Sequence, residues 1–264
     1  MAETAVWVYA ISRPRAQIPT VTGVSGEPIR LLHTGRLAAA VGSVDRDEYG
    51  EQPLRRNLED LGWLDTKARL HHRVITSLME AGPVVPMRLA ILYDDDERVQ
   101  QMLAEQEHEI EAALTAVSGR AEWGVKVFAG DPQKTDQGEA IPDPAPTRHS
   151  EVKSDRVGTA YLERKRAGLR AREASRRSHA TVAQSVYDEA RHFAVAGRQH
   201  ALQDSALRGD SREMLLNAAF LVEDERRDEF AAAMTALDGT PHGIDLQLTG
   251  PWPPYSFAFA GESP

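Results

Sequence analysis

The feature of this sequence that most constrains its fold is a proline-rich stretch from Gly130 to Ser150, GDPQKTDQGEAIPDPAPTRHS. It holds four prolines, and Ile141 is its only large aliphatic residue. Such a stretch buries too little apolar surface to offset the entropy lost on ordering. We therefore predict a flexible linker at residues 130–150, between an N-terminal domain at residues 1–129 and a C-terminal domain at residues 151–264.

The N-terminal half alternates between strand-like and helix-like patterns. Its predicted strands are apolar runs or apolar–polar alternations, at residues 6–11, 29–33, 37–44, 84–92 and 122–128, the last closing this domain. Apolar residues at three- and four-residue steps predict one helix over residues 54–79 and another from Asp94 to Val117. Asp94 and Glu97 have the spacing of a capping box, which we favour over a cation site for the acidic run 94–97.

The C-terminal half begins with a long helical stretch, predicted over about residues 155–208. A strand at 215–223, a helix capped by Asp224 and a strand at 244–248 follow. This order is part of a ferredoxin-like pattern. The sequence therefore predicts an α+β protein with two small α/β-sandwich-like domains, at least one ferredoxin-like, and a long helical segment between them.

Composition narrows the functional classes. The chain has 264 residues, a net charge of −9 and no cysteine, which excludes disulfides, cysteine-based zinc sites and a thiol nucleophile. The apolar run at residues 5–11 is short and follows no basic region, unlike a signal peptide, and no window nears the ~20 apolar residues of a membrane span. We expect a cytoplasmic protein that does not enter a membrane.

Motifs for catalysis are few. The sequence has no phosphate-binding glycine loop and no G-x-S-x-G nucleophile elbow. Two E-x-x-H pairs, Glu105 with His108 and Glu189 with His192, have the spacing of helical metal ligands, but so loose a motif is expected by chance. The adjacent His71 and His72 point about 100° apart on a helix and cannot easily share one metal. We expect no enzymatic activity, cofactor or metal; a metal-dependent enzyme is the alternative.

A basic stretch from Glu163 to Arg177 holds seven basic and two acidic side chains. The basic residues spread around the helix, and no aromatic residues stand among them to stack on bases. An acidic partner protein is therefore at least as good a fit as nucleic acid. A nucleic-acid-binding or regulatory module using residues 164–177 remains the alternative function.

The chain ends close to the motif GPWPPYSF, residues 250–257. Trp and Tyr beside prolines make a rigid amphipathic segment, which suits either a protein interface or packing on its own domain. Spacing alone does not choose between these two interpretations.

Five segments, in order along nearly the whole chain, resemble the gas vesicle F/L protein family. They are VWVYAI, ARLHHRVITSLMEAGPVVPMRLAILY, EWGVKV, NAAFLV and LTGPWPPYSF. The resemblance implies an accessory or minor structural protein of gas vesicle assembly, with two α+β domains, at least one ferredoxin-like, and neither enzymatic activity nor a cofactor. It also implies binding to the major gas vesicle shell protein, which limits aggregation of that very hydrophobic protein, and to other gas vesicle accessory proteins.

These expectations place the protein in the cytoplasm, associated with gas vesicles, with neither nucleic acid nor membrane as a partner. The candidate residues for the partner interface are Arg88 in the PMRLA segment, Arg170 in the basic stretch, and Trp252, Tyr255 and Phe257 near the end of the chain.

Overall fold

The computed structural model describes residues 3–14, 20–130, 154–203, 212–239 and 243–258. The chain divides into two compact units. The first comprises Met1–Trp123, Leu221–Arg226 and Thr249–Pro264; the second comprises Gly124–Phe220 and Arg227–Leu248. Of the expected linker, only Gly130 is described, because residues 131–150 lie outside the described residues. The domain limits drawn from this linker stay a prediction.

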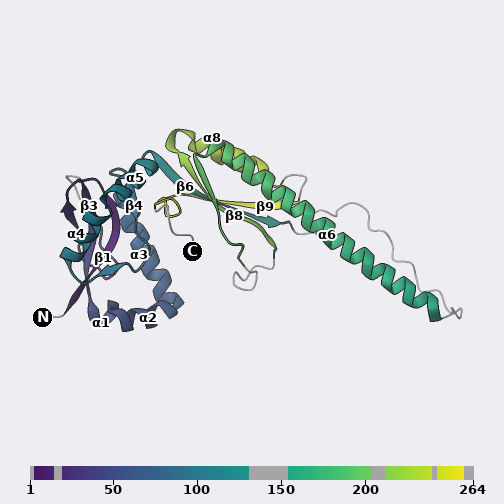
Figure 1. Ribbon diagram of the computed structural model, residues 1–264, viewed down its shortest axis with the longest axis horizontal. Helices are drawn as coiled ribbons and strands as arrows, with labels where there is room; N and C mark the ends of the chain where they lie inside the picture. The colour runs from purple at the N-terminus through teal and green to yellow at the C-terminus, as the bar shows by residue number, and fades with distance from the viewer. Residues whose placement is uncertain (1–2, 15–19, 131–153, 204–211, 240–242, 259–264) are drawn as a thin grey trace. The chain divides into compact units, whose positions relative to one another are not determined.

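The first unit is built on a five-stranded antiparallel sheet (Figure 1). The strand order is β2-β3-β1-β4, and β5 also pairs with β1. The strands are β1 Thr4–Ser12, β2 Arg30–Thr34, β3 Leu37–Asp45, β4 Val84–Pro86 and β5 Leu92–Tyr93. The expected strand at 84–92 was wrong as a single element, because Ala90 turns the chain with a φ of 65° between β4 and β5.

Helices cover both faces of this sheet (Figure 1). They are α1 Arg46–Tyr49, α2 Glu51–Glu59 and α3 Leu61–Met79, then α4 Asp96–Glu105 and α5 Glu107–Val117. The expected helix at 54–79 is broken at Asp60, whose side chain accepts hydrogen bonds from the backbone N–H groups of Gly62 and Trp63 and so begins α3. The cap of α4 is Asp95, one residue later than expected, because Asp94 pairs with Arg46 instead.

Strand β1 carries the core of this unit, since eight of its nine residues are buried. Val6 and Val8 face α4 and α5, and Trp7 and Tyr9 face α1 and α3. A continuous apolar run therefore identified a strand packed on both sides, as the sequence analysis expected for residues 6–11.

The second sheet has the order β7-β8-β6-β9. Its strands are β6 Arg120–Ala129, β7 Ala196–Gln199, β8 Met214–Glu223 and β9 Ile244–Trp252; α6 Ser154–Phe193, the 3-10 turn η1 Asp224–Arg226 and α8 Arg227–Leu237 connect them. This strand, helix, strand, strand, helix, strand sequence with that order is the ferredoxin-like topology, which confirms the predicted fold class. The expected strand at 122–128 is present as β6, but it pairs in this sheet and does not close the first.

The expected long helix is shorter than predicted. It ends at Phe193 instead of near residue 208, and β7 follows. Gly197 of β7 lies so close to Phe220 and Arg191 that an added Cβ would stand 3.1 Å and 2.6 Å from their atoms. The sequence AGRQ of β7 lacks β-branched residues, so periodicity gave no sign of this strand.

Strand β9 continues through Gly250, Pro251 and Trp252, although the prolines argued against a strand there. Because β9 is last in the strand order, proline at this edge leaves no neighbouring strand without a donor. No helix in the described ranges is long and apolar enough to cross a membrane.

Candidate interaction surface

Helix α3 carries two adjacent histidines with different surroundings, and the first is fixed inside the core. The Trp7 Nε1–H donates to His71 Nδ1 at 3.0 Å, and His71 Nε2 lies 3.0 Å from the carbonyl oxygen of Met87. Since Nδ1 accepts, the proton is on Nε2 and the ring is neutral. Burial, with only 2% of His71 exposed, is the main cause that lowers its pKa to about 4; the hydrogen bond with Met87 opposes this shift and the neighbouring His72 adds to it.

The second histidine, His72, holds the chain's C-terminal segment against α3. Its ring centroid lies 5.2 Å from that of Trp252, edge to face, and 6.3 Å from that of Tyr255, stacked. Partial burial lowers the pKa of His72, which favours the neutral ring between the two aromatic side chains. The two histidines therefore serve two different packing contacts.

Segment 249–258, which we call the tail, is anchored at a second point by Glu122. The Glu122 carboxylate accepts hydrogen bonds from the backbone N–H and the hydroxyl of Ser256, both at 2.7 Å. Burial and the charge of Glu122 raise the pKa of the Tyr255 hydroxyl, which stays protonated. Ala258 is buried in the core on the α4–α5 side, so the tail contacts elements on both faces of the first sheet.

These anchors leave part of the tail exposed. Trp252 is 41% exposed and Tyr255 is 37% exposed, while Phe257 is half-buried and the prolines between the aromatic residues are buried. The segment therefore packs on its own unit, as one of the two sequence-based interpretations expected, and two of its aromatic rings stay partly exposed. Its use as a protein interface stays a prediction. Side chains held this way lose little conformational entropy when a partner binds.

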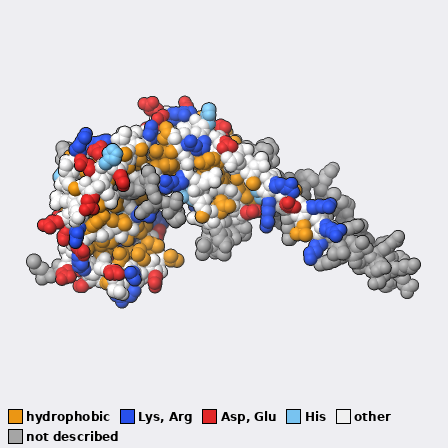
Figure 2. Space-filling view, viewed as in Figure 1, with side chains coloured by type: hydrophobic (Ala, Val, Ile, Leu, Met, Phe, Trp, Pro, Cys, Tyr) orange, Lys and Arg blue, Asp and Glu red, His pale blue; other side chains and the backbone are white. Residues whose placement is uncertain are grey.

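Further exposed apolar side chains lie at the start of α3 and the end of α2. Leu61 is 79% exposed and Leu58, at the end of α2, is 37% exposed. Leu61 and His72 are eleven residues apart, which places them on the same side of α3 at about 16 Å. Figure 2 shows hydrophobic side chains gathered over the region of α2 and α3. We call Leu58, Leu61, Trp252 and Tyr255 the apolar surface of the first unit.

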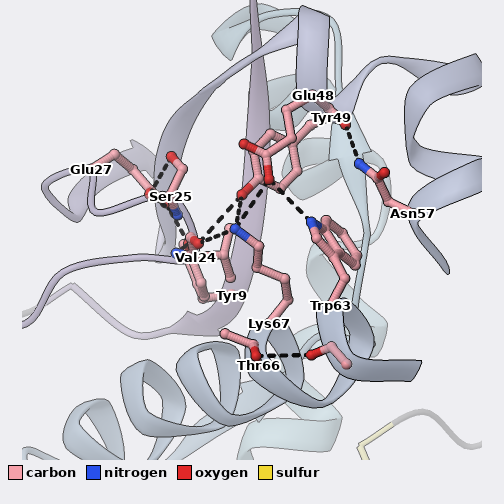
Figure 3. Close-up of polar contacts among 11 residues, drawn as sticks. Tyr9, Val24, Ser25, Glu27, Glu48, Tyr49, Asn57, Trp63, Thr66 and Lys67 are labelled. Atoms are coloured by element: carbon pink, nitrogen blue, oxygen red, sulfur yellow. Dashed lines mark hydrogen bonds and ion pairs between the residues drawn. The ribbon is translucent and has the colours of Figure 1, made fainter. Parts of the chain in front are cut away.

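A polar cluster behind this region fixes α3 to the neighbouring elements (Figure 3). The Lys67 ammonium group donates to the Tyr49 hydroxyl at 2.6 Å and the Val24 carbonyl at 3.0 Å, and pairs with Glu48 at 3.2 Å. Burial alone would raise the pKa of Glu48, but hydrogen bonds from Trp63 and Lys67 hold it below its usual value. The cluster ties α1 and the loop before β2 to α3.

Tyr9 also holds this loop. Its hydroxyl donates to Glu27 at 2.5 Å and accepts from the Val24 N–H at 2.8 Å. Burial, and then Glu27, raise the pKa of Tyr9, so its hydroxyl stays protonated. Gly23 and Gly42 leave the space that Glu27 fills, since a Cβ on either would stand within 2.4 Å of its carboxylate oxygen. These contacts hold α3 firmly and give the polar cluster a structural role.

The structure separates the five residues that the sequence proposed. Trp252 and Tyr255 come together on His72, with Phe257 beside them in the tail. Arg88 is exposed and follows Met87, whose carbonyl holds His71. Arg170 is exposed on α6 in the second unit. Sequence reasoning missed His72 and Glu122 as anchors, because their partners lie 183 and 134 residues away.

The E-x-x-H pairs show no metal geometry. Glu105 ends α4 and His108 lies in α5, so this pair does not share one helix. Within the described parts of the chain, no group of three or more His, Cys, Asp or Glu side chains could hold a metal ion.

The fold is α+β, with a ferredoxin-like second sheet, and the first unit carries two partly exposed aromatic side chains that pack on His72. The sequence matches the family described as "Gas vesicle synthesis protein GvpL/GvpF" over residues 5–258, and the chain belongs to this family. Membership confirms the resemblance found in the sequence and implies a role in gas vesicle assembly.

Individual relatives agree with this assignment. Gas vesicle protein L of Streptomyces sp. (strain CB03234) is 37% identical over 97% of this chain and 93% of its own length. Gas vesicle protein F of the same strain is 30% identical over 95% of this chain and 98% of its own length. The crystal structure of GvpF from Anabaena sp. PCC7120 has a TM-score of 0.65 at 18% identity, covering 98% of both chains, and shares the fold.

Proposed function

We propose that this protein is an accessory factor of gas vesicle assembly that binds the hydrophobic shell protein and limits its aggregation during vesicle nucleation. It acts by binding, without a catalytic step, in the cytoplasm and in association with gas vesicles. Other gas vesicle accessory proteins are further partners. The observation that carries the proposal is the pair of exposed rings, Trp252 and Tyr255, held by His72 and Glu122.

The composition supports an accessory role. A vesicle wall must present a continuous apolar face to gas, whereas this chain has a mean hydropathy of −0.44 and a net charge of −9. Of the seven exposed large apolar side chains in the described part of the chain, four form the apolar surface of the first unit, while Leu169, Val195 and Leu202 lie in the second unit. Such a patch with polar surroundings suits capture of an apolar segment from another protein.

The candidate residues would make different contacts with a partner. Trp252 and Tyr255 provide the central apolar contacts, since large rigid aromatic rings dominate many interfaces. Phe257 supports them from within the tail, and the exposed Arg88 supplies a polar contact at the rim. Arg170 lies on α6 and would contact a different partner surface.

Co-expression with the major gas vesicle shell protein tests the proposal. The shell protein should be captured in soluble form with tagged wild-type chain, and far less of it with Trp252→Ala/Tyr255→Ala. The matched control is Leu202→Ala/Leu169→Ala, which removes two exposed leucines of the second unit and should leave capture unchanged.

Folding of each variant is checked by circular dichroism, because only a folded variant reports on the surface. Equal capture by the wild-type chain and a folded Trp252→Ala/Tyr255→Ala variant would remove this surface from the proposal. Absence of any captured shell protein with the wild-type chain would overturn the proposed function itself.

A further inference from the structure

Helix α6 is far longer than its packing requires. Its 40 residues, Ser154–Phe193, extend about 60 Å. Among the side chains of α6 that the structure describes, the buried ones lie in the C-terminal part: Val186 and Ala190 are 3% and 0% exposed, and Tyr187 packs on Phe220 with ring centroids 5.3 Å apart. Figure 1 shows the N-terminal half of α6 continuing beyond α8 and the second sheet.

That N-terminal half has no core of its own. Every residue between 165 and 178 whose side chain the structure describes is exposed, and Leu169 is 57% exposed. A helix without tertiary contacts gains little stability in water, so this one benefits from a partner. The surface it offers that partner is charged, as the Lys and Arg side chains along it in Figure 2 show.

Residues 164–177, the basic segment, contain seven basic residues and one acidic residue, a net charge of +6. The whole chain has a net charge of −9, so the other 250 residues have a net charge of −15. Lys165, Arg166, Arg170 and Arg176 have no ion pair within the described part of the chain. The strongest basic surface thus belongs to an otherwise acidic molecule.

The first unit carries a matching acidic surface on α4 and α5. Residues 94–111 contain eight acidic side chains and one arginine. Asp94, Asp96 and Glu111 already pair with arginines of their own unit. Glu97, Glu105 and Glu109 are exposed and have no ion pair among the residues that the structure describes. We call these three residues the acidic ridge.

The ridge and the basic segment have similar dimensions. Glu97 and Glu105 are eight residues apart on α4, about 12 Å. Arg166 and Arg177 are eleven residues apart on α6, about 16 Å. Arg166, Arg170 and Arg177 are four and seven residues apart, so these three of the seven basic side chains lie on one side of α6, over a length comparable to the distance between Glu97 and Glu105.

We propose that the basic segment of α6 docks on the acidic ridge of a second copy of this chain. The two surfaces differ, so each contact is heterologous and a single contact leaves one of each surface unoccupied in the pair. Association can therefore continue to larger assemblies or close into a ring. The proposal is independent of shell-protein binding, which uses the apolar surface of the first unit.

Sedimentation of the purified chain tests this association. At about 50 mM salt the wild-type chain should form dimers or larger species, and at about 500 mM its dissociation constant should rise about tenfold or more, because salt screens exposed charges. Each of two triple variants, Lys165→Glu/Arg166→Glu/Arg170→Glu and Glu97→Arg/Glu105→Arg/Glu109→Arg, should remain monomeric at low salt.

An equal mixture of the two triple variants provides the decisive result. Each then offers a surface complementary to the other, so mixing should restore association at low salt. The control Glu59→Arg/Glu80→Arg/Glu189→Arg changes net charge by the same amount at exposed sites elsewhere and should not abolish wild-type association. A wild-type chain that stays monomeric at low salt would overturn the proposal, and so would a mixture that stays monomeric.

A short DNA duplex separates this proposal from nucleic-acid binding. If the wild-type chain stays monomeric but binds the duplex at low salt, and the α6 variant does not, the basic segment serves nucleic acid and the proposal fails. If the chain associates in the absence of the duplex, and if mixing the variants restores this association, the partner of the basic segment is a second copy of the chain.

Discussion

Two long helices of this molecule are held in opposite ways. Helix α3 packs on β1, donates through His71 to the Met87 carbonyl, is tied by Lys67 to its neighbours, and carries the tail on His72. The N-terminal half of α6 has only exposed side chains where the structure describes them. Because α3 is fixed on several sides, apolar rings that pack on it can stay partly exposed. The N-terminal half of α6 exposes charged side chains instead.

The two helices therefore suit partners of different chemistry. Rings on a rigid support suit an apolar protein, because little conformational entropy is lost on binding. A charged, solvated helix suits an oppositely charged surface and a salt-dependent contact. Substitutions in the two helices should therefore have effects of very different size.

The largest effect is expected at the anchor of α3. Trp7→Ala should lower the free energy of unfolding by about 3–5 kcal/mol, because it removes a fully buried ring and leaves His71 Nδ1 without its donor. Urea unfolding followed by circular dichroism measures this. Trp252→Ala is the matched control, since the same change at a 41% exposed site should have a much smaller effect. Equal losses for the two variants would contradict the account of α3.

Acid should weaken the same anchor. The pKa of His71 is about 4 in the folded protein against 6.5 for an ordinary histidine, so below pH 6.5 the unfolded chain binds a proton that the folded chain does not. The contribution of neutral His71 to stability is fully present above pH 6.5. The free energy of unfolding then falls by roughly 3 kcal/mol as the pH drops to about 4. Unfolding of His71→Gln across this range should lack that contribution. Parallel pH profiles for wild type and variant would show that His71 titrates normally.

Loss of the tail anchor should have an intermediate effect. Glu122→Ala removes the carboxylate that accepts two hydrogen bonds from Ser256, at a cost of about 2 kcal/mol to local stability. Amide hydrogen exchange in residues 252–258 should accelerate, while exchange in β1 stays slow. Glu223→Ala, which removes the ion pair with Arg120 at 3.4 Å, is the control and should leave the tail protected. Unchanged exchange in Glu122→Ala would mean that the tail is held elsewhere.

The smallest effect is expected in the unpacked half of α6. Leu169→Ala should change the free energy of unfolding by less than about 0.5 kcal/mol, because the leucine is 57% exposed. Val186→Ala, a substitution in the buried half of the same helix, should cost about 1–2 kcal/mol. A large loss in Leu169→Ala at high salt would show packing that the exposure of this residue does not account for.

The sequence predicted most of the elements that local patterns specify. The buried run of β1 and the apolar stripes of α3 and α6 were recognised, and with them the α+β class. The end of α6 at Phe193 was missed, since strand β7 depends on Gly197 fitting against Phe220 and not on its own propensity. The placement of β6 in the second sheet was missed for a similar reason, because pairing joins residues far apart in sequence.

The candidate surface was predicted in part. Trp252 and Tyr255 were identified from their setting beside prolines, and the structure places both rings on one histidine. The histidine itself was noticed only for metal chemistry, because its role depends on a contact across 183 residues. Exposed fractions, which separate interface candidates from core residues, follow from tertiary packing and are not encoded in spacing.

Site-directed photocrosslinking tests whether the tail contacts the shell protein. A photoreactive phenylalanine derivative replaces Tyr255, or Leu202 of the second unit as a control, in cells that produce the shell protein. We predict crosslinks from position 255 to the shell protein and none from position 202. Crosslinks of equal yield from both positions, or none from position 255 in a folded protein, would contradict the assignment of the tail as the binding surface.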